Sequence, residues 1–292
     1  MKLIKLIKDA TRIYNYPISN DLHSQKLGEY YFVFDEERVR KGKDQANIQK
    51  FDKNGVPYYK YTKEYYPISV GQMGLSVFHT YLKMKSKDVP IENILVYEDR
   101  FMEFVDWFYD EVGSDGIVWN DTPLMHWSES WKSSFAQSRA ISILLRGYQL
   151  TQDKKYLKRA WNALNVFDEW DDGFYKEYPD SCLLDGHIFS LLGIYDFVRA
   201  FPKFEPSQEL WAKGLSKLIE VLPDYDMGYW SRYGLGDEPS AKTYQMLHIN
   251  QMLLMYRLTG NPLFYVYRNK FLKQLTFKNL TKAYYNKWKA LK

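Results

Sequence analysis

From residue 67 onward, apolar side chains recur every three or four residues through eight successive segments, and this periodicity constrains the fold most. A period of 3.6 residues is that of an α-helix with one buried face, so the chain is predicted to be mainly α. Short turns containing Gly, Asp, Asn or Pro separate the segments, as in TGNP (259–262) and TQDKK (151–155). The expected helices are about 67–86, 91–112, 131–151, 154–170, 183–201, 206–222, 241–259 and 262–290.

These helices alternate between two kinds. One kind is apolar on most sides, with small and polar residues interspersed, as in 135–148, 184–197 and 244–256. The other kind is amphipathic, as in 154–170 and 207–222. An α/α toroid needs this alternation, because its inner helices are enclosed and its outer helices face water. We therefore predict an incomplete α/α toroid or barrel of helix hairpins; a stacked helical solenoid stays open as the alternative.

A weak internal repeat supports the hairpins. Residues 147–160 and 255–269 share Tyr-x-Leu-Thr, then a turn, then an aromatic-rich helix. Residues 1–64 differ from the rest: they are polar, Tyr-rich and weakly periodic, which predicts an extended arm with short strands. Within the arm, FDKNGVPYYKY (51–61) carries an Asn-Gly turn between aromatic residues and predicts a β-hairpin. We expect the arm to precede a catalytic toroid at 65–292, with small β elements in its loops.

Charge and cysteine content exclude several classes of protein. The 40 basic and 36 acidic residues are interspersed through most of the chain, unlike the clustered basic face of a nucleic-acid binder. Cys182 is the only cysteine, so neither a disulfide within the chain nor a cysteine zinc site is expected. GLGDEP (234–239) does not follow a strand as a phosphate-binding glycine loop must. The histidines form no HExxH pair, and no metal or other cofactor is predicted; they are His23, His79, His126, His187 and His248.

No apolar run reaches membrane-spanning length, and lysines interrupt the N-terminal segment where a signal peptide would be apolar. A cytoplasmic location is therefore expected. The aromatic content, 18%, exceeds what a core needs and favours a cleft lined with rings and phenol hydroxyls, which suits sugars.

Polar side chains that could carry chemistry fall at one end of the predicted ring. The loops at 171–182 and 224–240, together with the start of the helix at 241, would all open there. Taken singly, each residue has a simpler reading as a core tyrosine, a hydrogen-bonded core histidine, a surface ion pair or a helix cap, so the argument rests on their convergence. The residues are Glu177, Tyr178, Tyr229, Arg232, Tyr233, Tyr244, His248 and Asn250.

Five segments together resemble the C-terminal domain of the D-glucuronyl C5-epimerases, which convert glucuronate to iduronate within heparosan-type polysaccharides. They follow the family's order and cover most of residues 51–270. KEYP followed by DGHIFSLLGIYD, together with HINQ, is the specific part. The segments are YYPISVGQMGLSVFHTYL (65–82), WKSSFAQSRAISILLRGYQLT (131–151), YKEYPDSCLLDGHIFSLLGIYDF (175–197), LPDYDMGYWSRYGLG (222–236) and YQMLHINQMLLM (244–255).

The resemblance implies roles for particular residues. It places the catalytic glutamate and tyrosines at Glu177, Tyr178, Tyr229 and Tyr244. It implies that Arg232 holds the uronate carboxylate, and it assigns substrate binding also to Gln72, His248 and Asn250. Three departures bear on substrate length, sulfation preference and dimer geometry more than on the reaction. The segment 222–244 is shorter, Trp230 stands where an acidic residue is expected, and the family's long N-terminal region is mostly absent.

The residue types suit proton transfer at C5. Epimerisation removes the proton α to a carboxylate and returns one on the opposite face, so groups are needed on both sides of the ring. A tyrosine with a pKa of about 10 is a poor base but a good donor at neutral pH. We therefore assign Glu177 as the base and Tyr244 or Tyr229 as the proton donor on the opposite face. Tyr178 would position the substrate or share one of these roles. No cofactor is required.

Other functions stay open at this point. A uronate polysaccharide lyase begins with the same proton abstraction and then expels the C4 oxygen. A glycoside hydrolase would pair Glu177 with Asp185 or Asp237, and a non-catalytic glycan-binding protein would need the aromatic residues alone. The expected partner is an anionic uronate polysaccharide, modified before export in capsule or exopolysaccharide assembly. A homodimer is also conceivable, although no stripe marks an interface.

Overall fold

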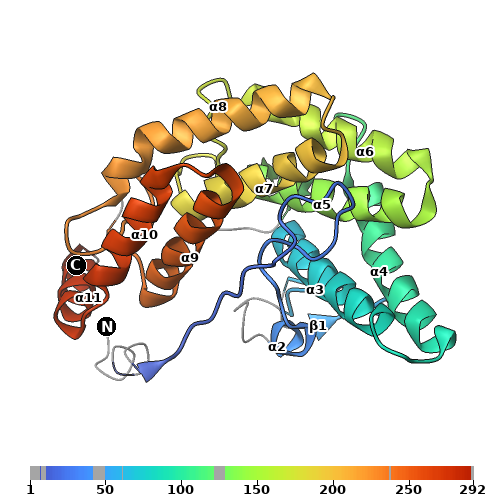
Figure 1. The fold of residues 1–292 in the computed structure, drawn as a ribbon, viewed down its shortest axis with the longest axis horizontal. Helices are drawn as coiled ribbons and strands as arrows, with labels where there is room; N and C mark the ends of the chain where they lie inside the picture. Colours follow the sequence, from blue (N-terminus) through green and yellow to red (C-terminus); the bar gives the residue numbers. More distant parts are fainter. Residues whose placement is uncertain are drawn as a thin grey trace.

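The computed structural model describes residues 7, 11–41, 50–60, 62–121, 129–236 and 238–290. Within these residues, four antiparallel helix hairpins follow one another along the chain (Figure 1). Their helices are α3 (Pro67–Lys85) with α4 (Ile91–Glu111), α5 (Ser134–Thr151) with α6 (Lys154–Asn165), α7 (Leu184–Ala200) with α8 (Glu205–Val221), and α9 (Lys242–Thr259) with α10 (Pro262–Gln274).

The four hairpins follow one another around an arc. The first helix of each hairpin lies on the inner side of this arc and the second lies on its outer side. α5 packs between α3 and α7, and α7 in turn contacts α9, whereas α4, α6, α8 and α10 each cover their own partner (Figure 1). Residues 134–147 of α5 are all buried, although they include Gln137, Arg139 and Arg146. By contrast, α6 buries one side only. The prediction of an incomplete α/α toroid built from helix hairpins is confirmed.

The repeated Tyr-x-Leu-Thr motif makes the same turn twice. The hydroxyl of Thr151 donates to the carbonyl of Gly147 and accepts from the N–H of Asp153, whose carboxylate then caps α6. Gln152 between them is left-handed, with φ 60°. This geometry folds the second helix back along the first. The second copy repeats each contact, with Thr259, Gly260 and Asn261 in the equivalent places.

Three helix boundaries differ from the predicted ones. The segment 262–290 is two helices, because α10 ends at Gln274 and α11 (Phe277–Ala290) begins after Thr276. The side-chain amide of Asn279 donates to the carbonyl of Gln274 at the break. The Thr276 hydroxyl accepts from the Asn279 N–H at 3.2 Å and so caps the start of α11, which packs against Trp230 from the loop before α9.

The other two boundaries lie at the ends of the second hairpin. Trp131–Lys132 is a strand, β4, paired antiparallel with β3 (Trp119–Asn120), so α5 starts later than expected. At the far end, α6 stops at Asn165 and continues as a 3-10 turn over Val166–Glu169.

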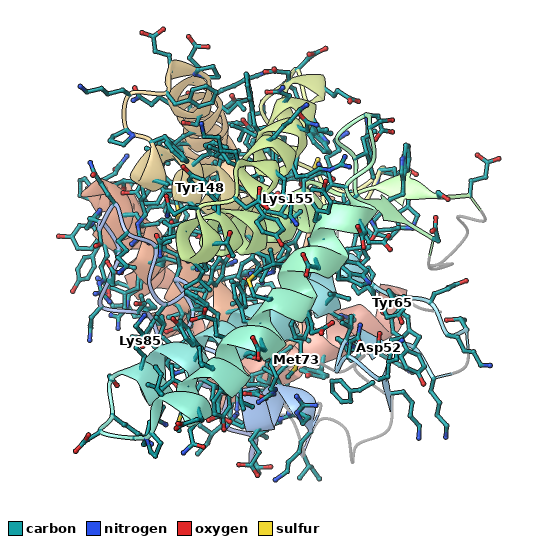
Figure 2. All side chains as sticks on the ribbon, turned by 90° about the vertical axis from the view of Figure 1, so that its right-hand side faces the viewer. Asp52, Tyr65, Met73, Lys85, Tyr148 and Lys155 are labelled. Carbon is teal, nitrogen blue, oxygen red and sulfur yellow. The ribbon has the colours of Figure 1, made fainter. Side chains whose placement is uncertain are left out.

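The predicted hairpin in the arm is confirmed. β1 (Lys50–Phe51) pairs antiparallel with β2 (Pro57–Tyr58), and Gly55 in the turn has φ 81°. Figure 2 shows this hairpin held against the start of the helical region, where the Tyr65 hydroxyl donates to Asp52 at 2.9 Å. Residue 61 of the predicted hairpin lies outside the described residues. The arm also contains a short helix that its polar sequence did not predict, α2 (Glu36–Arg40), capped by Asp35.

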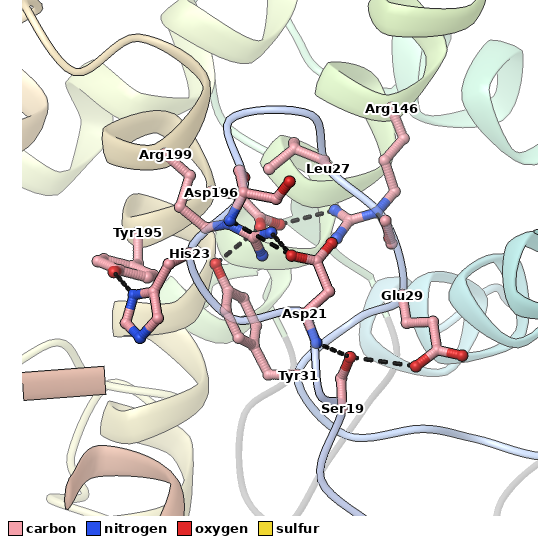
Figure 3. Close-up of polar contacts among 12 residues, drawn as sticks. Ser19, Asp21, His23, Leu27, Glu29, Tyr31, Arg146, Tyr195, Asp196 and Arg199 are labelled. Atoms are coloured by element: carbon pink, nitrogen blue, oxygen red, sulfur yellow. Dashed lines mark hydrogen bonds and ion pairs between the residues drawn. The ribbon is translucent and has the colours of Figure 1, made fainter. Parts of the chain in front are cut away.

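The arm is held to α5 and α7 by a buried polar network (Figure 3). The Asp196 carboxylate accepts from the Tyr31 hydroxyl at 2.8 Å and from the Arg146 guanidinium at 2.7 Å. Both side chains of the Arg146–Asp196 ion pair are fully buried. Arg199 bonds to Asp21, whose side chain is 36% exposed. The arm and the helices therefore share one core, and a division into domains at residue 64 stays a prediction.

Within the described part of the chain, no helix is long and apolar enough to cross a membrane.

Candidate active site

Two loops meet at the N-terminal ends of the inner helices. The loop before α7 and the loop before α9 are joined backbone to backbone: Leu183 bridges Gly234, and the Leu235 N–H donates to the Cys182 carbonyl at 3.0 Å. The Leu184 N–H also donates to the carbonyl of Tyr233. These bonds bring the first turn of α7 and the irregular residues before α9 together, so side chains far apart in sequence share one site.

Glu177 and Asp185 form a buried carboxyl pair at the start of α7. Glu177 is 6% exposed and Asp185 is 5% exposed. Burial raises the pKa of Glu177 well above its usual value, and the nearby Asp185 charge raises it further. Burial also raises the pKa of Asp185. The pair therefore holds a proton at a pH where ordinary carboxyls are ionised, and one member can act as a base near neutrality.

Tyrosine hydroxyls line the same site. The Tyr178 and Tyr66 hydroxyls lie 3.4 Å apart, and Tyr178 also hydrogen-bonds Glu177. The Tyr233 hydroxyl donates to that of Tyr244 at 3.5 Å, with ring centroids 4.4 Å apart. Tyr66 precedes α3 and Tyr244 begins α9, so the site draws on the ends of several inner helices.

These tyrosines are neutral at physiological pH. Burial raises the pKa of Tyr178 and the Glu177 charge adds to it. Burial likewise raises the pKa of Tyr233 and Tyr244, with Asp185 as the next cause for both. A neutral phenol can give its proton to a carbanion, but it is too weak a base to remove the proton from C5. The only strong base candidate among the groups described here is thus the carboxyl pair.

Arg139 and Gln72 lie beside the carboxyl pair, on α5 and α3. The Arg139 guanidinium is fully buried and donates to the Gln72 side-chain oxygen at 2.8 Å. It also lies 4.7 to 5.1 Å from the ring centroids of Tyr30, Phe135 and Phe189. The Arg139 charge lowers the pKa of Glu177 and so opposes the effect of burial. Gln72, predicted to bind substrate, contacts the site through this arginine.

His248 and Asn250, also predicted to bind substrate, make contacts that position the loop and helix α9. The His248 Nδ1 lies 2.8 Å from the Ser231 hydroxyl, and burial lowers the pKa of His248 to about 3, so the ring is neutral. The Asn250 amide donates to the Met246 carbonyl one turn earlier. Their roles in substrate binding stay predictions.

The structure does not bring Tyr229 to the carboxyl pair. Its hydroxyl accepts from the Asn286 amide at 2.8 Å, and the Lys282 ammonium lies 3.9 Å from its ring centroid, both on α11. Arg232 is half-buried in the same loop, where its N–H donates to the Tyr225 carbonyl and its backbone bridges Pro239. A catalytic role for Tyr229 and carboxylate binding by Arg232 stay predictions. Asp237, one of the two hydrolase candidates, lies outside the described residues.

Three members of the site were not singled out for it from the sequence. From the sequence, Asp185 is predicted only as a hydrolase carboxylate, and neither Tyr66 nor Arg139 is among the predicted site residues. A signal for Arg139 did exist, because a charged residue within the enclosed run FAQSRAISILL must be satisfied inside the protein. Among the described residues, no three His, Cys, Asp or Glu side chains come together as a metal site requires.

Gly186 allows the Glu177 side chain to pack directly against the backbone of α7. A Cβ atom at Gly186 would lie 2.5 Å from the Glu177 carboxylate oxygen and 2.7 Å from its Cβ. Alanine suits a helix, so Gly186→Ala should fold but displace the carboxyl. The C5 proton exchange that the sequence predicts for this site should then fall about 10- to 100-fold. The rate of C5 exchange in D₂O would be measured, with circular dichroism to show that Gly186→Ala is folded. An unchanged rate in the folded variant would mean that the position of the Glu177 carboxyl does not matter.

The chain is similar to known proteins over much of its helical part. Residues 120–273, which include all four predicted catalytic residues, match the family model described as D-glucuronyl C5-epimerase C-terminus. A D-glucuronyl C5-epimerase of Caenorhabditis elegans is 35% identical over 132 residues, which are 36% of this chain but only 21% of that enzyme. An uncharacterized protein of Methanocaldococcus jannaschii is 26% identical over 70% of this chain and 75% of its own length.

A structural likeness to the GH76 α-mannanase of Bacteroides thetaiotaomicron is weaker, with a TM-score of 0.48 and 11% identity. The matched region covers 73% of this chain and 60% of the mannanase, and the likeness is too distant to bear on function. The family match, by contrast, spans more than half of the chain and contains both loops of the site. The chain therefore belongs to the family described as D-glucuronyl C5-epimerase C-terminus.

Proposed function

We propose that the protein epimerises glucuronate to iduronate at C5 within an anionic polysaccharide. The observation that carries the proposal is the pairing of one buried carboxyl pair with neutral tyrosines. Glu177 and Asp185 supply a base with a raised pKa, while Tyr178, Tyr233 and Tyr244 supply hydroxyl donors. A C5 epimerase needs this combination, because the proton leaves one face and a proton arrives on the other.

In the proposed mechanism, Asp185 carries the one proton of the carboxyl pair. The ionised Glu177 then takes the C5 proton, and the electron pair moves onto the substrate carboxylate. Arg232, from the loop before α9, is the proposed partner of that developing charge. Tyr244 then donates its phenolic proton to C5 from the opposite face. The hydrogen bond from Tyr233 stabilises the phenolate that this leaves.

The site must then recover its protons. Glu177 is protonated and Tyr244 is a phenolate after one turnover. Tyr178 hydrogen-bonds Glu177, and its ionisation is influenced by Tyr244. We propose that Tyr178 passes the proton from Glu177 to Tyr244, which restores the ionised carboxylate and the neutral phenol for the next turnover. This step accounts for a glutamate and a tyrosine adjacent in the chain at the edge of the site.

The test is proton NMR of a glucuronate polysaccharide, such as heparosan or its N-sulfated form, incubated with the protein in D₂O. We expect deuterium at C5 and the signals of iduronate. Signals of a 4,5-unsaturated uronate would show a lyase instead. Polymer that binds but exchanges no C5 proton would contradict epimerisation and favour a glycan-binding protein.

A further inference from the structure

The C-terminal part of the chain is basic without any acidic residue. Residues 239–292 contain ten Lys or Arg and no Asp or Glu, although the whole chain has 36 acidic residues against 40 basic ones. The rest of the chain therefore has more acidic than basic residues, and nine of these ten basic residues lie in α9, α10 and α11. These helices stand together at one end of the arc (Figure 1). A surface with one sign of charge attracts a partner with the opposite sign.

On α11 the basic residues share a face with aromatic ones. Lys278, Lys282, Tyr285 and Lys289 are spaced by four, three and four residues, so they form one stripe about 16 Å long. All four are exposed. The exposed Trp288 ring lies beside this stripe, with its centroid 6.1 Å from that of Tyr285. The opposite face of the helix is buried against Trp230 through Leu280, Ala283 and Tyr284.

Tyr229 connects this stripe with the candidate active site. Its ring lies against the Lys282 ammonium and its hydroxyl bonds to Asn286, so it belongs to the surface of α11. Tyr233, four residues later in the same loop, pairs with Tyr244 in the site. The Asp226 carboxylate at the start of this loop is bonded to Lys270 and Gln274, which offsets its negative charge. A chain leaving the site along this loop would meet Tyr229 and then α11.

We infer that Tyr229 and the exposed face of α11 form a secondary binding surface for the anionic polysaccharide, outside the catalytic site. The lysine ammonium groups pair with uronate carboxylates, and the aromatic rings cover the apolar faces of the sugars. Each exposed ion pair is weak alone, but several on one polymer add up. This inference rests on the proposed function, because it takes the same polymer as ligand.

The pattern on α11 argues against a lipid surface as the partner. A helix lying in a membrane places its aromatic and aliphatic residues on one face and its lysines on the other. Here Lys278, Lys282 and Lys289 share a face with Tyr285. The apolar face of α11 is already occupied by the core of the protein. A polymer that carries a charge on each repeat fits this interleaved surface better than a bilayer does.

The test compares two triple variants of the whole protein. One is Lys278→Gln with Lys282→Gln and Lys289→Gln. The matched control is Lys154→Gln with Lys158→Gln on α6 and Lys203→Gln in the turn before α8, all at exposed positions. Binding of heparosan polymer is measured by calorimetry at low and physiological salt. We expect the α11 variant to weaken binding about tenfold and to lower its salt dependence, and the control to change it less than twofold.

A second comparison separates this inference from the proposed function. C5 exchange in D₂O is measured for the polymer and for a short heparosan oligosaccharide that fills the site alone. The α11 variant should raise KM for the polymer about tenfold, with kcat and oligosaccharide exchange retained. Polymer binding that depends on α11 without any exchange would support the surface but contradict epimerisation. Equal binding losses in both triple variants, or binding of α11 to phosphatidylserine vesicles but not to heparosan, would overturn the inference.

Tyr229 can be tested by itself. Tyr229→Phe keeps the ring and should keep polymer affinity, whereas Tyr229→Ala should weaken it about fivefold. If Tyr229→Phe lowers kcat a hundredfold with polymer affinity unchanged, the residue is catalytic and its assignment to the binding surface is wrong.

Discussion

Replacing Glu177 with glutamine should abolish most C5 exchange and at the same time make the folded protein more stable. The amide keeps the shape of the side chain but cannot take a proton from C5. General base catalysis is worth about 10²- to 10⁴-fold, so kcat should fall by that factor. Substrate binding should change little, because only the transition state needs the base.

The gain in stability follows from the raised pKa. A carboxyl whose pKa is higher in the folded protein than in the unfolded chain favours the folded state only while it stays protonated. As pH rises above the unfolded value of about 4.3, the unfolded chain releases the proton first and stability falls. Glu177 therefore destabilises the protein at pH 7 to 8. Glu177→Gln should raise the free energy of unfolding there by about 1 kcal/mol, and by less near pH 4.

Chemical denaturation at pH 4 and pH 8, beside C5 exchange in D₂O, would measure both effects. Glu209→Gln, at an exposed position on α8, is the matched control and should alter neither activity nor stability. A variant that is inactive but also less stable at pH 8 would mean that Glu177 holds the loop together and is not an unfavourably buried base. Full activity in Glu177→Gln would remove the proposed mechanism.

The largest loss of stability is expected at Asp196. This carboxylate is fully buried and bonds both Arg146 and Tyr31, which ties α7 to α5 and to the arm (Figure 3). Asp196→Asn leaves the Arg146 charge without a buried counter-charge. Breaking a buried ion pair from one side costs about 3–5 kcal/mol, so Tm should fall by roughly 10 °C.

Asp21→Asn is the matched control, because Asp21 pairs with Arg199 in the same network but is partly exposed. That change should cost less than about 1 kcal/mol. Thermal unfolding of both variants gives the comparison. Similar losses would mean that burial of the Arg146–Asp196 pair does not matter. Limited proteolysis of the arm would show whether the loss begins with its release.

Much of the fold could be predicted because its signals are local. The helical period is set by which residues are apolar, and it predicts the helices from Pro67 to the start of α10 at Pro262 to within about five residues. The Asn-Gly turn at Gly55 works in the same way, because its conformation is a property of those residues. The break after Gln274 was not predicted. Its local signal is a single cap, in which the Thr276 hydroxyl accepts from the Asn279 N–H, while α11 packs against Trp230, more than 40 residues away.

The residues of the candidate site also differ in whether local sequence or long-range contacts place them. Glu177, Tyr178 and Tyr244 were predicted from the resemblance and from their places in loops and helix starts at one end of the ring. Their catalytic roles stay predictions. Tyr229 and Tyr233 show where such reasoning ends, since both lie in one irregular loop. Whether each points toward the carboxyl pair or toward α11 depends on long-range backbone bonds, such as those from Leu183 to Gly234.

By itself, the sequence determined the helices, their hairpins and the chemistry that a few loop residues offer. These follow from period, caps and side-chain type, which act over a turn or two of helix. Only the tertiary structure decided which charges are buried together. It placed Asp185 and Arg139 near Glu177, and a pKa is set by burial and neighbouring charge, neither of which has a sequence period.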